Sequence, residues 1–127
     1  MLGRALLALA GIILVGAAVH HAFGGQMVAG WLAGERRQVL ELLWYAAALP
    51  WLVVGVAWLL IAWRGDHRLR LLIWLLAIIP AGAAAMIAYA LGPTFIPMWL
   101  LAGAALLAVL GSIALPRVTS RPAAPSP

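Results

Sequence analysis

The chain has 127 residues, of which 67% are hydrophobic and 9% are charged. Soluble domains are about 45–50% apolar and about 25% charged, and a chain of this size still exposes about a third of the surface that it could bury. A water-soluble core is therefore excluded, and lipid must surround most of the chain. The absence of cysteine excludes disulfides, thiolate metal sites and thiol nucleophiles.

The charged residues give a net charge of +5, and all eight basic residues are arginine. Together with the many alanines and glycines, this indicates a bacterial source. In a soluble protein such a charge would suggest a nucleic-acid partner. Here the arginines flank apolar runs, so we expect the lipid bilayer as the partner and no nucleic acid.

The first apolar run covers residues 5–23 and follows Arg4. A helix needs about 20 residues to cross a membrane, so this run is long enough. A signal peptide is the alternative, because Gly16-Ala17-Ala18 resembles a cleavage site. We expect residues 24–38 to connect two helices, with Gly24-Gly25 ending the first and a short interfacial helix placing Trp31 among the headgroups.

The second run covers residues 39–63 and has no charge between Glu41 and Arg64. Pro50 lies in its middle, where it removes one backbone hydrogen bond and frees the carbonyl of Ala46. We expect a kink there. The freed carbonyl is a candidate acceptor for a buried indole N–H.

Tryptophan recurs every seven residues in this run, and a small residue follows four places after each one: Trp44, Trp51 and Trp58, then Ala48, Gly55 and Ala62. Such a repeat is typical of a packed seam between helices. The alternative is an interfacial anchor at Trp44, with the other two facing lipid.

Residues 71–116 carry no formal charge and are too long for one crossing. Gly92-Pro93-Thr94 divides them into helices at about 71–91 and 95–115. The third helix has a seam of small residues, Ala77, Ala81, Ala84 and Ala88, and the last has Ala104, Ala108 and Gly111. We therefore predict an all-α transmembrane domain over residues 1–116, with four transmembrane helices in an antiparallel bundle, and a disordered cytoplasmic tail at 117–127.

The arginines predict the orientation. With four crossings, six of them share the side of both termini and two lie on the other: Arg4, Arg64, Arg68, Arg70, Arg117 and Arg121 against Arg36 and Arg37. Positive residues favour the cytoplasmic side, so we expect an inner-membrane protein with both termini in the cytoplasm.

Most titratable groups other than arginine fall at the periplasmic ends: His20, His21, Glu41, Tyr45 and Tyr89. In a closed bundle they would form a small polar pocket. Helical register turns His21 inward, because it follows Ala17 by one turn. The alternative is that these are ordinary interfacial residues and that Glu41 pairs with Arg37.

Such a pocket would suit a metal, a cation or a quinone headgroup as its ligand. Adjacent histidines diverge by about 100° on a helix, so His20 and His21 do not readily share a metal, and we expect neither a metal site nor a cofactor. His67 belongs to the opposite side, which argues against a haem held by two histidines of one chain. The sequence holds no recognisable catalytic motif.

The length and four helices resemble the small multidrug-resistance family. That family carries a membrane glutamate in its first helix, whereas Glu41 lies in the second. Two other elements, His20-His21-Ala22-Phe23-Gly24-Gly25 and Trp44-Tyr45, resemble small four-helix bacterial membrane proteins of uncharacterised function, a likeness that implies no activity. We expect a non-enzymatic structural or accessory bundle that contacts other membrane proteins or itself. The alternatives are a small transporter and a redox accessory subunit.

Overall fold

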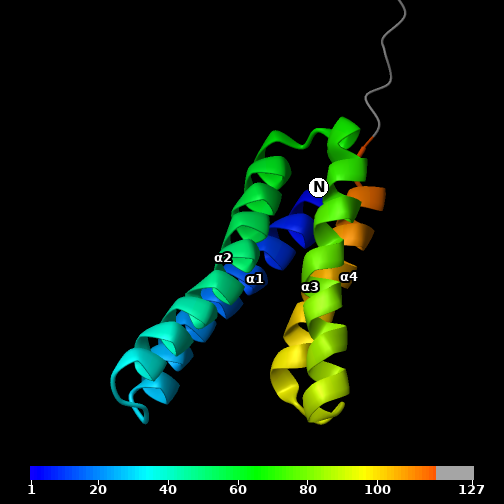
Figure 1. The fold of residues 1–127 in the computed structure, drawn as a ribbon. Coiled ribbons are helices and arrows are strands. Elements are labelled where there is room, and N and C mark those ends of the chain that lie inside the picture. The colour runs from blue at the N-terminus through cyan, green and yellow to red at the C-terminus, as the bar shows by residue number, and fades with distance from the viewer. Residues whose placement is uncertain (117–127) are drawn as a thin grey trace, which may run out of the picture.

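Residues 1–116 are described by a computed structural model, which shows four long helices (Figure 1). They are α1 (Leu2–Ala29), α2 (Glu35–Arg64), α3 (Arg70–Leu91) and α4 (Ile96–Ile113), with one 3₁₀ turn, η1 (His67–Leu69), before α3. All four are long and apolar enough to cross a membrane. The predicted all-α fold with four transmembrane helices is confirmed, and the tail predicted at 117–127 lies outside the described residues.

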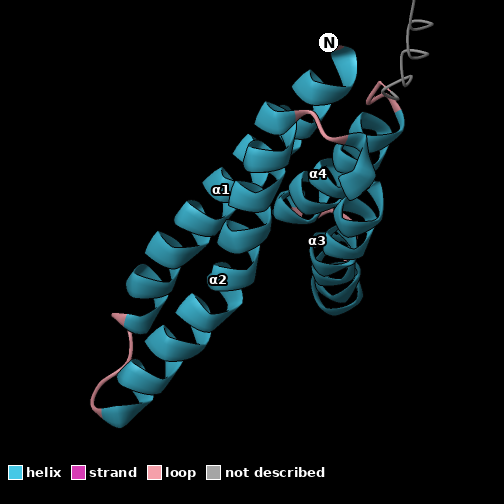
Figure 2. Ribbon diagram, turned by 90° about the horizontal axis from the view of Figure 1, so that it is seen from above, coloured by secondary structure: helices cyan, strands magenta, loops and turns pink. Residues whose placement is uncertain are grey.

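The helices form a row rather than a closed ring. α1 packs against both α2 and α4, and α3 packs against α4, whereas α2 and α3 touch little. Figures 1 and 2 show the α1–α2 hairpin diverging from the α3–α4 hairpin towards the ends away from the N-terminus. The bundle is therefore antiparallel but open along the edge between α2 and α3, with α1 as a central element.

The first helix is longer than the sequence indicated. α1 continues through Gly24-Gly25 to Ala29, so the prediction that these glycines end the helix was wrong. Gly25 is buried, and a Cβ there would overlap the side chain of Trp44. In lipid, a glycine lets a neighbouring helix approach closely rather than breaking the helix. Met27 accordingly belongs to α1, and no separate interfacial helix forms around it.

Glycines also mark the two crossings of α1. At the crossing with α2, a Cβ on Gly11 would lie 2.8 Å from the carbonyl oxygen of Gly55. At the crossing with α4, a Cβ on Gly111 would lie 2.9 Å from the carbonyl oxygen of Gly3. The backbones meet because these residues have no side chain, which suits helices that associate by close packing.

The tryptophan repeat of α2 is a packed seam, as the first interpretation predicted. Trp58 is fully buried, Trp51 is 9% exposed and Trp44 is half-buried, and the small residues that follow them are buried as well: Ala48, Gly55 and Ala62. The expected bond to the Ala46 carbonyl is not made. In the described part of the chain, the indole N–H groups of Trp44 and Trp58 have no hydrogen-bond partner.

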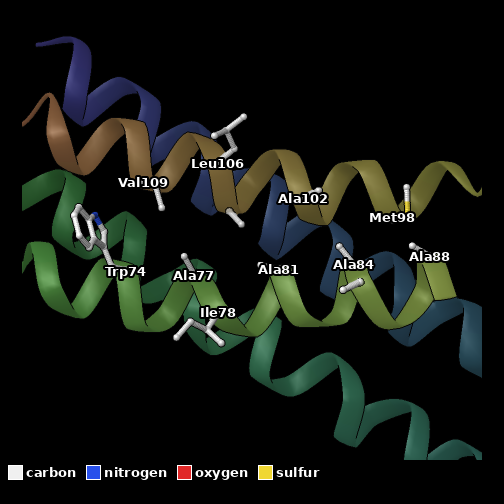
Figure 3. A pocket seen from close by; sticks show the side chains of 12 residues that line it. Trp74, Ala77, Ile78, Ala81, Ala84, Ala88, Met98, Ala102, Leu106 and Val109 are labelled. Carbon is white, nitrogen blue, oxygen red and sulfur yellow. The ribbon is translucent and has the colours of Figure 1, made fainter. Parts of the chain in front are cut away.

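The α3–α4 pair is joined by small residues and one polar link. Ala77 and Ala84 of the predicted α3 seam are buried, but Ala81 is exposed. The indole Nε1 of Trp74 donates a 2.7 Å hydrogen bond to Oγ of Ser112, which in turn donates to the carbonyl of Val109. Beside this link, a shallow apolar groove of about 580 Å³ runs between the two helices (Figure 3).

Candidate functional site

The end of the α1–α2 hairpin that includes His21 holds four of the five predicted polar residues. The His21 ring lies between two indoles of α2, with centroids 4.9 Å from Trp44 and 4.9 Å from Trp51. The Trp44 ring stacks at an interplanar angle of 23°, and the Trp51 ring is tilted at 53°. His21 thus faces α2, as its helical register predicted, whereas His20 is exposed.

The remaining polar residues of this hairpin form two pairs. Nε2 of Gln26 donates a 2.7 Å hydrogen bond to the hydroxyl of Tyr45, which ties α1 to α2. Nε of Arg37 donates to Oε1 of Glu41 at 2.9 Å. The carboxylate of Glu41 is therefore held in the ion pair that the alternative interpretation expected.

Tyr89 stands apart from the other four residues. It is 95% exposed on α3, which diverges from the α1–α2 hairpin at this end (Figure 1). The structure therefore places His21 and Tyr45 in one hairpin and leaves Tyr89 on a separate surface. The sequence expected a closed ring of helices, and the open edge between α2 and α3 is the reason for the difference.

The geometry gives no metal centre among residues 1–116, where no three side chains of His, Cys, Asp or Glu lie close enough to share an ion. His67 lies near the opposite end, with Nδ1 3.9 Å from Oδ1 of Asp66. What the hairpin end offers chemically is one imidazole between two aromatic faces, without a hydrogen bond to any described residue. Indole faces favour an aromatic or cationic neighbour, and the His21 ring itself takes that place between them.

The opposite end of the molecule is organised by arginines. Arg4, at the start of α1, donates from Nε to the carbonyl of Ala62 at 2.7 Å and from Nη2 to the carbonyl of Trp63. Arg70, at the start of α3, donates from Nη2 to the carbonyl of Leu115 at 2.6 Å and more weakly to that of Ile113 at 3.2 Å. In each hairpin, an arginine that opens the first helix satisfies carbonyls left unpaired at the end of the second.

Sequence reasoning missed several of these contacts. Ser112 is the only buried polar residue in the described part of the chain, and a lone hydroxyl in an apolar run was the available signal. Gln26 was missed because it was assigned to a connection. Arg4 and Arg70 were interpreted as topology signals only, since nothing local reveals which helix end an arginine reaches.

Comparison of the chain with protein-family models, with curated proteins and with solved structures finds no match. Its class follows from the fold, since four long apolar helices fit a multi-pass helical membrane protein.

Proposed function

We propose that this chain is a non-enzymatic structural or accessory protein of the bacterial inner membrane, akin to the small four-helix proteins that its sequence resembles. The observation that carries the proposal is that the polar side chains of this chain form hydrogen bonds between its own helices. They join helices to one another: Arg4 to α2, Arg70 to the last residue of α4, Trp74 to Ser112 and Gln26 to Tyr45. Hydrogen bonds between helices of this kind stabilise a membrane bundle.

The orientation proposed is with both termini in the cytoplasm. The contacts of Arg4 with the end of α2, and of Arg70 with the end of α4, support a common end for these arginines, with Arg64 and Arg68 nearby. That end has four arginines against the single carboxylate of Asp66. The other end has Arg36 and Arg37 against two glutamates, so the charge bias favours the first end for the cytoplasm.

The first helix is proposed to stay in the mature protein. Removal of residues 1–18 would delete the part of α1 that contacts α2 at Gly55 and α4 at Gly111. The buried side chains of those two helices would then face lipid or each other without a fitted partner. This central position favours a transmembrane helix over a signal peptide.

The partner of the accessory role is proposed to be a membrane protein, either another subunit or a second copy, that packs on α3. Only Ile73, Ala77, Pro80 and Ala84 of α3 are buried. The small residues Ala81, Gly82 and Ala85 are exposed, so a further helix could approach this surface closely.

The test is cross-linking in native membranes, which the absence of cysteine makes simple. Full-length Ala85→Cys protein, labelled at the cysteine with a maleimide that carries a photoreactive benzophenone and then irradiated, is expected to give a discrete cross-linked band that co-purifies. Val53→Cys, exposed on α2, serves as the matched control and should give much less. Equal cross-linking at both positions, or none at either, would refute the accessory role at α3.

The second candidate is a redox accessory subunit, favoured by the position of His21 between two indoles with no hydrogen bond to another described residue. An absorbance band or bound ion in the purified protein, lost in His21→Ala, would support it. Transport has less support, because Glu41 is already paired with Arg37. Proton-coupled efflux that disappears in Glu41→Gln would favour transport instead.

A further inference from the structure

The arginines at the N-terminal end of the molecule fall into two groups. Arg4 and Arg70 donate to helix-terminal carbonyls. The side chains of Arg64 and Arg68 are exposed, and neither guanidinium forms a hydrogen bond or ion pair with any residue in 1–116. The first group has a structural role within the fold, and the second group is free to bind something outside it.

Little negative charge lies near this second group. Asp66, between the two arginines in sequence, accepts a 2.9 Å hydrogen bond from the backbone N–H of Arg68 and caps η1. The first turn of α3 contains no acidic residue, although Arg68 and Arg70 lie at its positive end. Cations are disfavoured at a helix N-terminus, because the helix dipole is positive there. An anion bound at this place would offset the repulsion between the arginines and the start of α3.

The neighbouring residues indicate the depth of these guanidiniums. Arg64 ends the long apolar run of α2, and Trp63 beside it is 77% exposed. Tryptophan is enriched in membrane helices at the level of the lipid headgroups, and Trp63 stands where the apolar run ends. The guanidinium groups are thus at the depth of the lipid phosphates, which arginine binds through paired N–H donors.

We propose that Arg64 and Arg68 bind the phosphodiester of anionic phospholipid, so that anionic lipids are enriched around this end of the protein. The inference depends on the membrane location of the chain but not on its accessory role. The opposite end of the molecule should not attract anionic lipid in this way. Arg36 and Arg37 are balanced there by Glu35 and Glu41, and Arg37 is already paired with Glu41.

The experiment uses the full chain in vesicles of phosphatidylcholine that contain a minor fraction of spin-labelled phosphatidylglycerol. The protein-associated fraction of this lipid is compared with that of spin-labelled phosphatidylcholine. An arginine near the membrane surface contributes about 1 kcal/mol to the attraction of anionic lipid, which is about fivefold in relative association. Arg64→Gln/Arg68→Gln is therefore expected to lose most of the preference at low salt.

Two control variants make the result specific. Arg36→Gln removes an exposed arginine at the opposite end and should keep the preference. Arg4→Gln should lower the thermal stability of the protein but should keep its preference for anionic lipid. The proposal is overturned if the double variant retains the wild-type preference, or if Arg36→Gln reduces it equally. Should the double variant fail to fold by circular dichroism, Arg64→Gln and Arg68→Gln are measured singly against the same controls.

Discussion

Gly11 of α1 and Gly55 of α2 face each other where the backbones of the first hairpin meet. A Cβ on Gly11 would lie 2.8 Å from the Gly55 carbonyl oxygen, and a Cβ on Gly55 would lie 3.0 Å from the Gly11 carbonyl oxygen. Both separations are shorter than normal contacts of a methyl carbon, so the backbones touch only because both residues are glycine. The stability of the α1–α2 pair should therefore depend on this position.

The first prediction concerns Gly11→Ala. The added methyl group would meet the carbonyl oxygen of Gly55 as well as the side chain of Leu59, and the backbone carbonyl cannot turn aside, so the helices must separate. We expect a loss of about 1–3 kcal/mol in the free energy of unfolding. Denaturant unfolding in detergent, followed by circular dichroism, measures it. Gly16→Ala is the matched control, because no atom lies within 4 Å of its Cβ position. Equal stability of the two variants would contradict the close contact of α1 and α2 at Gly11.

The second prediction uses the adjacent glycines at the far end of α1. A Cβ on Gly25 would overlap Trp44, whereas a Cβ on Gly24 has no neighbour within 4 Å. Gly25→Ala should therefore destabilise the protein by about 1–3 kcal/mol, and Gly24→Ala should not. In a Trp44→Ala background the difference between the two alanine variants should disappear. Its persistence there would show that Trp44 is not the residue that Gly25 accommodates.

This pair of glycines also shows where sequence reasoning succeeded and where it failed. The heptad of Trp44, Trp51 and Trp58 with its small residues predicted the seam correctly, because spacing alone decides which side chains share a helix face. The sequence predicts a helix end at Gly25, because a glycine that breaks a helix and a glycine that admits an indole look the same in sequence. Only the position of α2 distinguishes them.

In the candidate site, too, the sequence predicted the local features correctly and failed where distant helices had to be placed. The register that placed His21 inward was local information, and the structure agrees with it. The expected convergence of Tyr89 with the other residues depended on whether α3 closes the ring with α2, and that is a relationship between helices far apart in sequence. The contacts of Arg4 and Arg70 also depend on how distant helices pack, since each contact spans more than forty residues.

The third prediction concerns the hydrogen bond between Trp74 and Ser112. Trp74→Phe and Ser112→Ala should each destabilise the protein, and the double variant should lose less than the sum of the two. Hydrogen bonds between membrane helices give coupling energies of about 0.6 kcal/mol on average and about 1.7 at most. A double-mutant cycle by unfolding in detergent measures this coupling. Strictly additive losses would mean that the bond contributes nothing.

The fourth prediction concerns the arginine that closes the first hairpin. Arg4→Gln removes donors to the carbonyls of Ala62 and Trp63 and should cost about 1 kcal/mol, because the group is partly solvated. The melting temperature in detergent should fall relative to wild type. Arg36→Gln removes the same charge from a side chain without a hydrogen bond to any described residue and should leave it unchanged. A similar fall in both variants would indicate an effect of net charge alone.

The fifth prediction tests the threading of the chain through the membrane, on which the rest of the account depends. Single cysteines are introduced at Ala33 and Thr94 in the two loops of one end, and at Leu2 and Pro116 at the other, in a chain that has no cysteine of its own. Whole cells are treated with a membrane-impermeant maleimide. The account predicts labelling at Ala33→Cys and Thr94→Cys, with Leu2→Cys and Pro116→Cys labelled only after lysis. Labelling of Leu2→Cys or Pro116→Cys in intact cells, or protection of Ala33→Cys, would contradict it.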